Sequence, residues 1–296
     1  MKSQIEGLAN LIGYKYRNID LKIHYLFKIF PVQLIPSNTL IIKNIDDYQI
    51  SKPTVLISCG KKSVKASIAL KKKYKKIFNI HIQDPKTCYK FFDLIIAPKH
   101  DNLNLSNSLA TTFAIHNIKF EKNKNIKQKN TINFIIGGKS KNFKFDKTVQ
   151  EKILNDIKIL SQKYFVQIIP SRRTPEILIE KIKNNKISNT DILINTNDPV
   201  KYGQFLSQSI ANIVTWESIS MISESVYSGV GTFIYPFEKE SLPKKYKNFH
   251  KDLMEKKYIK NFSINLTPFK TSINEDLSEL KNNILYKINQ SPIFNT

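Results

Sequence analysis

The chain has 296 residues and a formal net charge of +23 at pH 7, a length that favours two domains of ordinary size. Its 18 Phe and 13 Tyr argue against a disordered protein. The charge is spread almost evenly along the chain, so it predicts attraction to nucleic acid, anionic lipid or phosphorylated ligands without choosing among them. Neither a secretory signal nor an apolar run near 18 residues is found, so we expect a cytoplasmic protein without a membrane-spanning segment.

Short apolar strands alternate with helices in the first half of the chain. Strands are predicted at 55–58, 78–83 and 93–97. The lysine-rich segment after the first strand is predicted to be a helix with Val64, Ile68 and Tyr74 near its apolar side. The polar stretch 119–130, which contains five lysines, is predicted to be a linker to a second domain.

The alternation restarts after this stretch. Strands are predicted at 132–136, 165–169, 191–195, 211–215 and 232–235, and helices at 146–164, from 175 onward, at 200–209, 218–228 and 273–289. Such alternation implies parallel sheets covered by helices on both faces. The sequence therefore predicts an α/β fold of two Rossmann-like domains whose parallel sheets face a cleft. The expected parts are 1–118, the linker 119–130, 131–270, and a C-terminal helix within 271–296.

Signatures of several other protein classes are absent. Gly138-Lys139-Ser140 resembles the end of a P-loop, but Asn133 stands where that motif needs glycine. No G-x-G-x-x-G occurs, so ATPases and dinucleotide oxidoreductases lose their main support. The two cysteines, Cys59 and Cys88, lack metal-ligand spacing and stand in apolar surroundings. We expect both to be buried, unreactive thiols, and we expect neither a metal nor a cofactor.

Arginine is rare, because only three of the 47 basic residues are arginine. Two of these, Arg172 and Arg173, follow Ser171 directly after the strand predicted at 165–169. Arginine grips phosphate or carboxylate through two parallel hydrogen bonds, which lysine does poorly. Since ligands bind just past strand ends in open α/β sheets, the pair predicts an anion site. An arginine pair on a surface loop is the alternative.

Two other predicted strand ends carry candidate ligand contacts. Gly137-Gly138, followed by Lys139, would let a ligand approach the backbone closely, although a plain tight turn explains the pair about as well. His100-Asp101 follows the strand at 93–97 and is a candidate acid–base pair. A structural His-Asp pair in a loop is the more common arrangement.

The helix predicted at 218–228 is the richest candidate. Ser218, Ser220 and Met221 lie at its start, where unpaired amides and the positive end of the helix dipole favour an anion. Glu224 lies over a turn further on, within reach of the hydroxyls of a sugar attached to a phosphate. A serine-rich cap with an exposed glutamate is the alternative. The segment 244–254 interleaves basic and aromatic residues, and a solvated helix with an ordinary buried side is favoured over a surface for lipid or nucleic acid.

Taken together, these segments resemble the bacterial branch of the ELM-type mitochondrial-fission family, which looks like a GT-B glycosyltransferase. The matching stretches follow the family order over nearly the whole chain, at 3–13, 57–62, 82–85, 92–101, 135–140, 170–175, 218–229 and 249–253. The resemblance implies a nucleotide-sugar donor held mainly by the second domain. The implied donor contacts are Gly137, Gly138, Ser218, Ser220 and Glu224, with Arg172 and Arg173 near the phosphates.

Two positions depart from the family pattern. Family members usually begin with a strand and a glycine-bearing loop before the Gln-x-x-Gly-Leu-Ala stretch, whereas here Met1 stands three residues before Gln4. Either Met1 is internal to a longer protein, or the first domain lacks its opening strand. Trp216-Glu217 stands where the family usually has a small polar pair, and we expect it to reshape the contact with the base or the phosphates.

The resemblance implies a GT-B-type glycosyltransferase that is independent of metal and moves a sugar from a nucleoside-diphosphate donor to a lipid-linked or other cell-envelope glycan acceptor. Its expected place is the cytoplasm, including the periphery of the inner membrane. His100 or Asp101 would activate the acceptor. The alternatives are a nucleoside-diphosphate-sugar epimerase on the same fold and a non-catalytic scaffold protein at an anionic membrane surface. Nucleic acid is the least favoured partner, because no recognised binding module is present.

Overall fold

The structure, a computed structural model, describes residues 1–120, 130–140, 143–193, 198–237, 243–273 and 277–295. The chain forms two compact units. The first unit combines Met1–Asn117 with Glu275–Thr296, and the second unit is Ile118–Asn274. The C-terminal segment therefore packs with the N-terminal part of the chain rather than with the residues that precede it.

The first unit contains a sheet of four parallel strands. They are β1 (Thr54–Cys59), β2 (Ile77–Ile82), β3 (Leu94–Pro98) and β4 (Ser108–Thr111), paired in this order. Strand β1 therefore forms one edge of the sheet. Residues 1–53 are all described and contain no strand.

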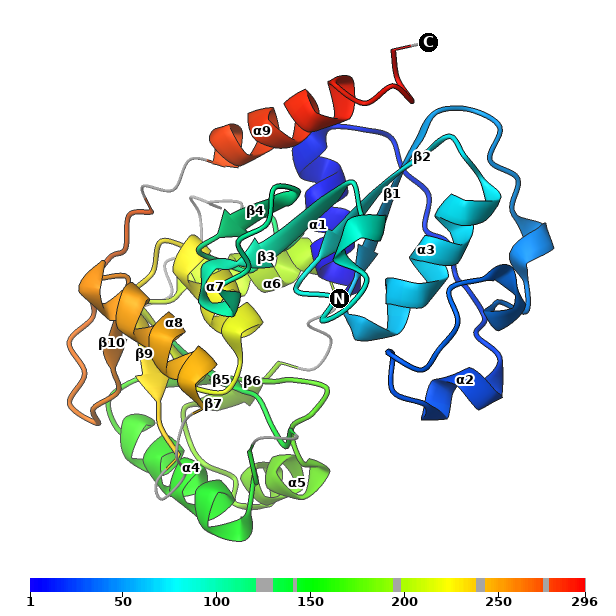
Figure 1. Cartoon of the computed structure of the whole chain (residues 1–296). Coiled ribbons are helices and arrows are strands. Elements are labelled where there is room, and N and C mark those ends of the chain that lie inside the picture. The colour runs from blue at the N-terminus through cyan, green and yellow to red at the C-terminus, as the bar shows by residue number, and fades with distance from the viewer. Residues whose placement is uncertain (121–129, 141–142, 194–197, 238–242, 274–276, 296) are drawn as a thin grey trace. The chain divides into compact units, whose positions relative to one another are not determined.

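Helices cover both faces of this first sheet (Figure 1). They include α1 (Lys2–Ile12), α3 (Val64–Lys73) and α9 (Leu277–Asn289), while the short α2 (Tyr25–Ile29) lies in the segment before β1. On one face, Leu8 of α1 and Ile284 of α9 pack with Ile80 of β2. On the other face, Ile68 of α3 packs with Ile95 of β3. Successive strand side chains thus serve opposite faces, as a sheet covered on both sides requires.

The second unit contains six parallel strands. They are β5 (Thr131–Ile136), β6 (Phe165–Pro170), β7 (Thr190–Ile192), β8 (Ala211–Thr215), β9 (Thr232–Tyr235) and β10 (Ile259–Asn261), in the order β10-β9-β8-β5-β6-β7. Its helices are α4 (Lys147–Leu160), α5 (Glu176–Asn184), α6 (Pro199–Gln208), α7 (Ile219–Tyr227) and α8 (Lys244–Glu255).

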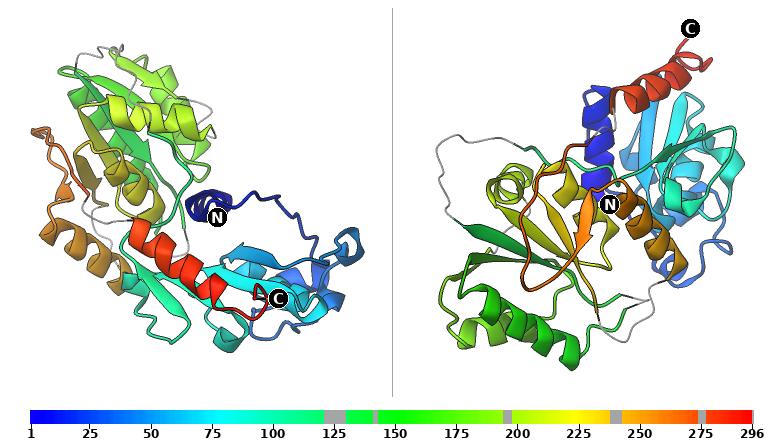
Figure 2. Two further views of the ribbon diagram at one scale, coloured as in Figure 1. Left: turned by 90° about the horizontal axis from the view of Figure 1, so that it is seen from above. Right: turned by 90° about the vertical axis from the view of Figure 1, so that its left-hand side faces the viewer.

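The two faces of the second sheet differ in polarity. Helices α4 and α5 lie together on one face, over an apolar core that includes Ile153 and Ile168 (Figures 1 and 2). The face toward α6 buries Asn133 and Asn212, which are hydrogen-bonded to each other at 2.7 Å. Asn133 also donates to the backbone oxygen of Phe205 in α6. Buried amides of this kind are stable only when they are paired, so they fix α6 against the sheet.

The predicted α/β fold with two sets of parallel strands is confirmed, although the sequence pattern does not predict α1, β4 or β10. Tyr74 lies just beyond α3, because the helix ends at Lys73, and it packs against the cluster that includes Ala66 and Leu70 of the helix. Cys59 is buried, and burial raises the pKa of its thiol to about 11. Cys88 is half-exposed instead of buried, and the Lys65 amine lies 3.4 Å from its sulfur.

Parts of three predicted elements lie outside the described residues. These are most of the linker at 119–130, the end of the strand predicted at 191–195, and the start of the helix predicted at 273–289. Helix α8 has Phe249 and Leu253 buried along one side, which agrees with the predicted solvated helix with an ordinary buried side.

Candidate functional site

The strand order of the second sheet reverses between β5 and β8. From β5 the chain continues to β6 and β7 on one side, and from β8 it continues to β9 and β10 on the other. In open parallel sheets, ligands bind outside the carboxyl ends of the strands at such a switch point. Three candidate segments leave the sheet here, from neighbouring strands: 137–139 after β5, 171–174 after β6, and 216–218 after β8.

The two glycines after β5 are approached closely by the protein itself. The N–H of Gly137 donates to Thr215 Oγ1, and the N–H of Gly138 donates to Glu217 Oε1, each at 2.8 Å. A Cβ at 137 would lie 1.6 Å from Glu217 Oε1, and a Cβ at 138 would lie 1.9 Å from the backbone oxygen of Arg173. Glycine is therefore needed at both positions for the protein's own packing.

Glu217 lies at the centre of this cluster and is only 3% exposed. Its Oε1 accepts from Gly138 N–H and from the Thr215 hydroxyl, the latter at 3.3 Å. Its Oε2 has no hydrogen-bond partner among the described residues. Burial raises the pKa of Glu217, while its hydrogen bonds and the charge of Arg173 act in the opposite direction. A carboxyl group thus stands where the sequence predicts a backbone amide open to an anion.

The other half of the Trp216-Glu217 departure serves packing. The Trp216 ring lies 6.1 Å from that of Phe143 and 5.8 Å from that of Phe237, measured between ring centroids. Aromatic clusters of this kind contribute to stability through buried area and ring geometry. Trp216 therefore anchors the loop that places Glu217 against the glycines.

The arginine pair stands in a tight turn that is tied to the end of β5. Ser171 N–H donates to the hydroxyl oxygen of Thr174 at 2.8 Å. That oxygen lies 2.7 Å from each of the backbone oxygens of Ile136 and Gly137. Arg172 and Arg173 are both exposed. The turn thus holds two exposed arginine side chains beside the glycine pair, where they are accessible to an anionic ligand.

Helix α7 starts directly after this cluster. Ser218 is its N-cap, and its hydroxyl accepts from Met221 N–H at 3.5 Å. Ser220, Met221 and Glu224 are half-buried, in contrast to the apolar side of the helix. The Tyr202 hydroxyl donates to Glu224 at 3.4 Å, and burial raises the pKa of Glu224 to about 7.

The structure brings most of the predicted donor residues to one end of the second sheet, with Lys139 exposed beside the glycines. His100 and Asp101 are not part of this group, because they lie after β3 in the first unit. Glu217 and Thr215 are the site residues that the predicted set omits. Glu217 could have been identified in the sequence because it is an acidic residue between a buried strand and the start of a helix, where a neutral capping residue is more usual.

The described part of the chain contains neither a long apolar helix nor a cluster of metal-ligating side chains. No helix there combines the length and the hydropathy that a bilayer crossing requires. No three His, Cys, Asp or Glu side chains there are grouped closely enough to hold a metal ion.

Solved structures with a similar fold include MurG and WaaG. MurG of Acinetobacter baumannii is 12% identical, with 98% of this chain and 80% of that chain covered and a TM-score of 0.45. WaaG, a glycosyltransferase of lipopolysaccharide biosynthesis, is 12% identical, with coverages of 79% and 60% and a TM-score of 0.32. With TM-scores below 0.5, these likenesses carry no argument about activity.

Two relatives are recognised by sequence. An uncharacterized protein of Rickettsia prowazekii is 28% identical over 337 aligned residues, which cover 94% of this chain and 92% of that protein. Mitochondrial fission protein ELM1 of Arabidopsis thaliana is 21% identical over 252 residues, which cover 73% of this chain and 58% of that protein. The family model for mitochondrial fission ELM1 matches residues 1–283. The match confirms the resemblance derived from the motifs, and the chain belongs to the mitochondrial fission ELM1 family.

Proposed function

We propose that the second unit binds a nucleoside-diphosphate sugar at its switch point and that the protein transfers the sugar to a cell-envelope acceptor. One observation carries the proposal. The neighbouring strands β8, β5 and β6 end in a helix start, a glycine pair and an arginine pair. The helix start and the arginine pair favour phosphate, and with the glycine pair they surround the place where open α/β sheets bind ligands.

The proposed roles follow from exposure and hydrogen bonding. Arg172 and Arg173 are exposed and would pair with the phosphate oxygens. The N–H groups of Ile219 and Ser220, at the start of α7, have no acceptor among the described residues and would bind the same group. Glu224, one turn further along α7, would accept from a ribose hydroxyl. Stabilisation of the leaving diphosphate by these groups would lower the barrier by about 3–5 kcal/mol.

The protonation state of Glu217 determines how strongly the proposed site would bind a diphosphate. When it is ionised, its buried carboxylate opposes a diphosphate at the glycine pair, because like charges in a desolvated site repel strongly. When it is protonated, the repulsion disappears and Oε1 still accepts from Gly138. Burial raises the pKa of Glu217, which favours the neutral form that a diphosphate requires.

One observation favours a second candidate function, a non-catalytic scaffold. The amides of both glycines already have acceptors within the protein, so neither is open to a phosphate. A scaffold would bind no nucleotide, and its net charge of +23 predicts salt-sensitive association with anionic vesicles. An epimerase would share the donor site and would release an epimer or free sugar without any acceptor.

A thermal-shift screen against UDP-, GDP-, CMP- and dTDP-sugars tests the proposal. One of these ligands should raise Tm by roughly 5 °C at a hundredfold excess over its Kd. An Arg172→Gln/Arg173→Gln double variant should lose most of this shift. Lys147→Gln, on an 82% exposed side chain of α4, should keep it and serves as the charge control. If no nucleotide sugar shifts Tm, the transferase proposal is wrong and the scaffold is favoured.

A further inference from the structure

The carboxyl group of Glu217 has one oxygen that the protein uses and one that it leaves without a partner. Oε1 accepts from Gly138 N–H at 2.8 Å and from the Thr215 hydroxyl at 3.3 Å. Oε2 is buried and has no hydrogen-bond partner among the described residues. Buried polar atoms are nearly always paired, because a buried atom without a partner destabilises the protein. Since the protein holds the carboxyl group through Oε1, Oε2 is the oxygen that a ligand can engage.

The two hydrogen bonds at Oε1 determine where a proton would lie on neutral Glu217. Gly138 N–H and the Thr215 hydroxyl both donate to Oε1, and the carbonyl oxygen of a carboxylic acid is its better acceptor. The proton of the neutral acid therefore belongs on Oε2. Protonation turns Oε2 into a donor, and this O–H group has no acceptor among the described residues.

The surroundings of Glu217 act on this proton in opposite directions. Burial raises the pKa of Glu217, whereas its hydrogen bonds and the charge of Arg173 lower it. Gly138 and Thr215, which also contact the carboxyl group, are uncharged. A diphosphate would bring negative charge to the same place and would pair with Arg173, and both changes raise the pKa of Glu217 further. Binding of the ligand and protonation of Glu217 therefore favour each other.

We propose that Glu217 binds the diphosphate as a neutral acid, with its Oε2–H donating to a phosphate oxygen while Oε1 stays on Gly138. The carboxyl group would link the glycine loop to the ligand, since Gly138 N–H is not itself open to a phosphate. This inference rests on the proposed donor site. It goes further, because it makes Glu217 a direct contact of the ligand and makes binding take up a proton from solvent.

Calorimetry on the full-length chain tests the proton uptake. The ligand is the nucleotide sugar that gives the largest thermal shift, and its two esterified phosphates carry no proton to release near pH 8. Binding is measured at pH 8 in two buffers that differ in ionisation enthalpy. Per bound ligand, wild type should take up about half a proton or more beyond the uptake of Glu217→Gln. Glu224 is present in both proteins, so its own titration cancels.

Two neutral variants separate the hydrogen bond from the loss of charge. In Glu217→Gln, Gly138 N–H still requires an acceptor, so the amide oxygen faces Gly138 and the amide NH₂ takes the place of Oε2–H. Glu217→Met is also neutral, but it offers no donor. At pH 8 the Gln variant should bind the nucleotide sugar about tenfold more tightly than the Met variant. Lys147→Gln, on an exposed side chain of α4, should match wild type in affinity and in proton uptake.

The outcomes distinguish this inference from the proposed function. Equal affinity of the two neutral variants, or equal proton uptake by wild type and Glu217→Gln, would overturn the role of Glu217 and leave the donor site standing. If Glu217→Met fails to fold because Gly138 N–H loses its acceptor, the proton uptake alone decides. If no nucleotide sugar binds, the proposed function is wrong and this inference falls with it.

Discussion

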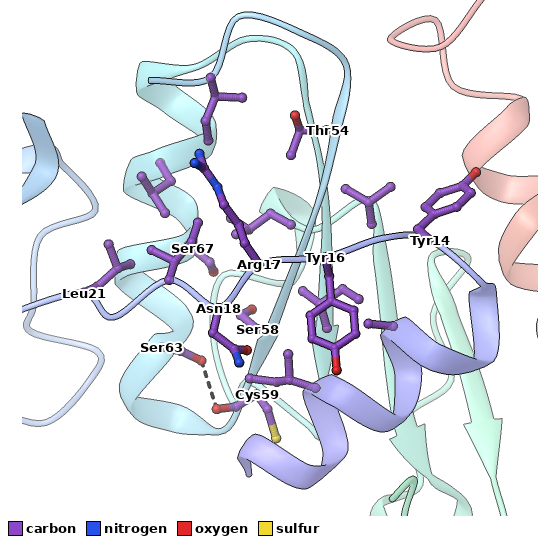
Figure 3. Close-up of a pocket in the computed structure, with 18 of the residues that line it drawn as sticks. Tyr14, Tyr16, Arg17, Asn18, Leu21, Thr54, Ser58, Cys59, Ser63 and Ser67 are labelled. Atoms are coloured by element: carbon purple, nitrogen blue, oxygen red, sulfur yellow. Dashed lines mark hydrogen bonds between the residues drawn. The ribbon is translucent and has the colours of Figure 1, made fainter. Parts of the chain in front are cut away.

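The two units build the same kind of parallel sheet and treat their candidate binding places in opposite ways. In the second unit, the protein's own groups fill the switch point, since Thr215 accepts from the Gly137 amide and Glu217 accepts from the Gly138 amide. In the first unit, a cavity of about 1160 Å³ lies beside β1 (Figure 3), and the backbone groups of Val55 and Ile57, which face away from β2, have no partner among the described residues. The difference shows that the shared type of sheet determines where loops converge, while individual side chains determine whether a ligand can reach the backbone there.

The largest expected effect tests how tightly the glycine pair of the second unit is packed against the turn that contains Arg173. Gly138→Ala places a Cβ against the backbone oxygen of Arg173, which cannot move without disturbing the turn. We expect a loss of about 3 kcal/mol in the free energy of unfolding, measured by denaturant titration. Gly13→Ala is the control, because its φ of 80° is unfavourable but nothing lies within 4 Å of the added Cβ, so it should cost only about 1 kcal/mol. Equal losses would show that the glycine loop is not tightly packed.

The second effect concerns the open groups of the same unit. The Arg172→Gln/Arg173→Gln variant should weaken the nucleotide sugar that gives the largest thermal shift by about 30- to 100-fold, measured by calorimetry. Its unfolding free energy should stay within about 0.5 kcal/mol of wild type, because both side chains are exposed. Unchanged affinity would remove the arginines from the site.

The third effect concerns the switch point of the second unit, where a substitution removes the negative charge of Glu217 beside the glycine pair. Glu217→Gln keeps an acceptor for Gly138 and removes the negative charge, so nucleotide-sugar affinity at pH 8 should rise about tenfold. In the wild type, affinity should rise as pH falls, because protonation of Glu217 removes the repulsion. Burial raises the pKa of Glu224 to about 7, so the same series in Glu224→Gln separates its titration from that of Glu217. A weaker complex in Glu217→Gln would show that the carboxylate assists binding.

The smallest effect is on the pH dependence of the free energy of unfolding. Folding raises the pKa of Glu224 to about 7, so its contribution is favourable below about pH 4.5 and is lost as pH rises through 7. The difference in unfolding free energy between wild type and Glu224→Gln should therefore change by about 1 kcal/mol between pH 5 and pH 8. Buried histidines whose pKa is lowered to about 4, namely His81, His116 and His250, act equally in both proteins and cancel. A flat difference would contradict the burial of Glu224.

Most of the fold could be predicted because strands such as β3 and β5 are short runs of mostly apolar residues with polar segments on either side. Strand β4 could not, because Ser108–Thr111 is short and has no such run; it pairs only through its position beside β3. The three candidate segments of the second unit follow from strand ends alone. The role of Glu217 does not, because its contact with Gly138 joins residues 79 positions apart and depends on how two loops pack.

The central claim is that the switch point of the second sheet holds the diphosphate. Hydrogen exchange of the full-length chain, with and without the nucleotide sugar that gives the largest thermal shift, tests it most directly. The account predicts slower exchange at 171–174 and at the start of α7, with no change at β1. Protection confined to the first unit, or no protection anywhere at saturating ligand, would contradict it.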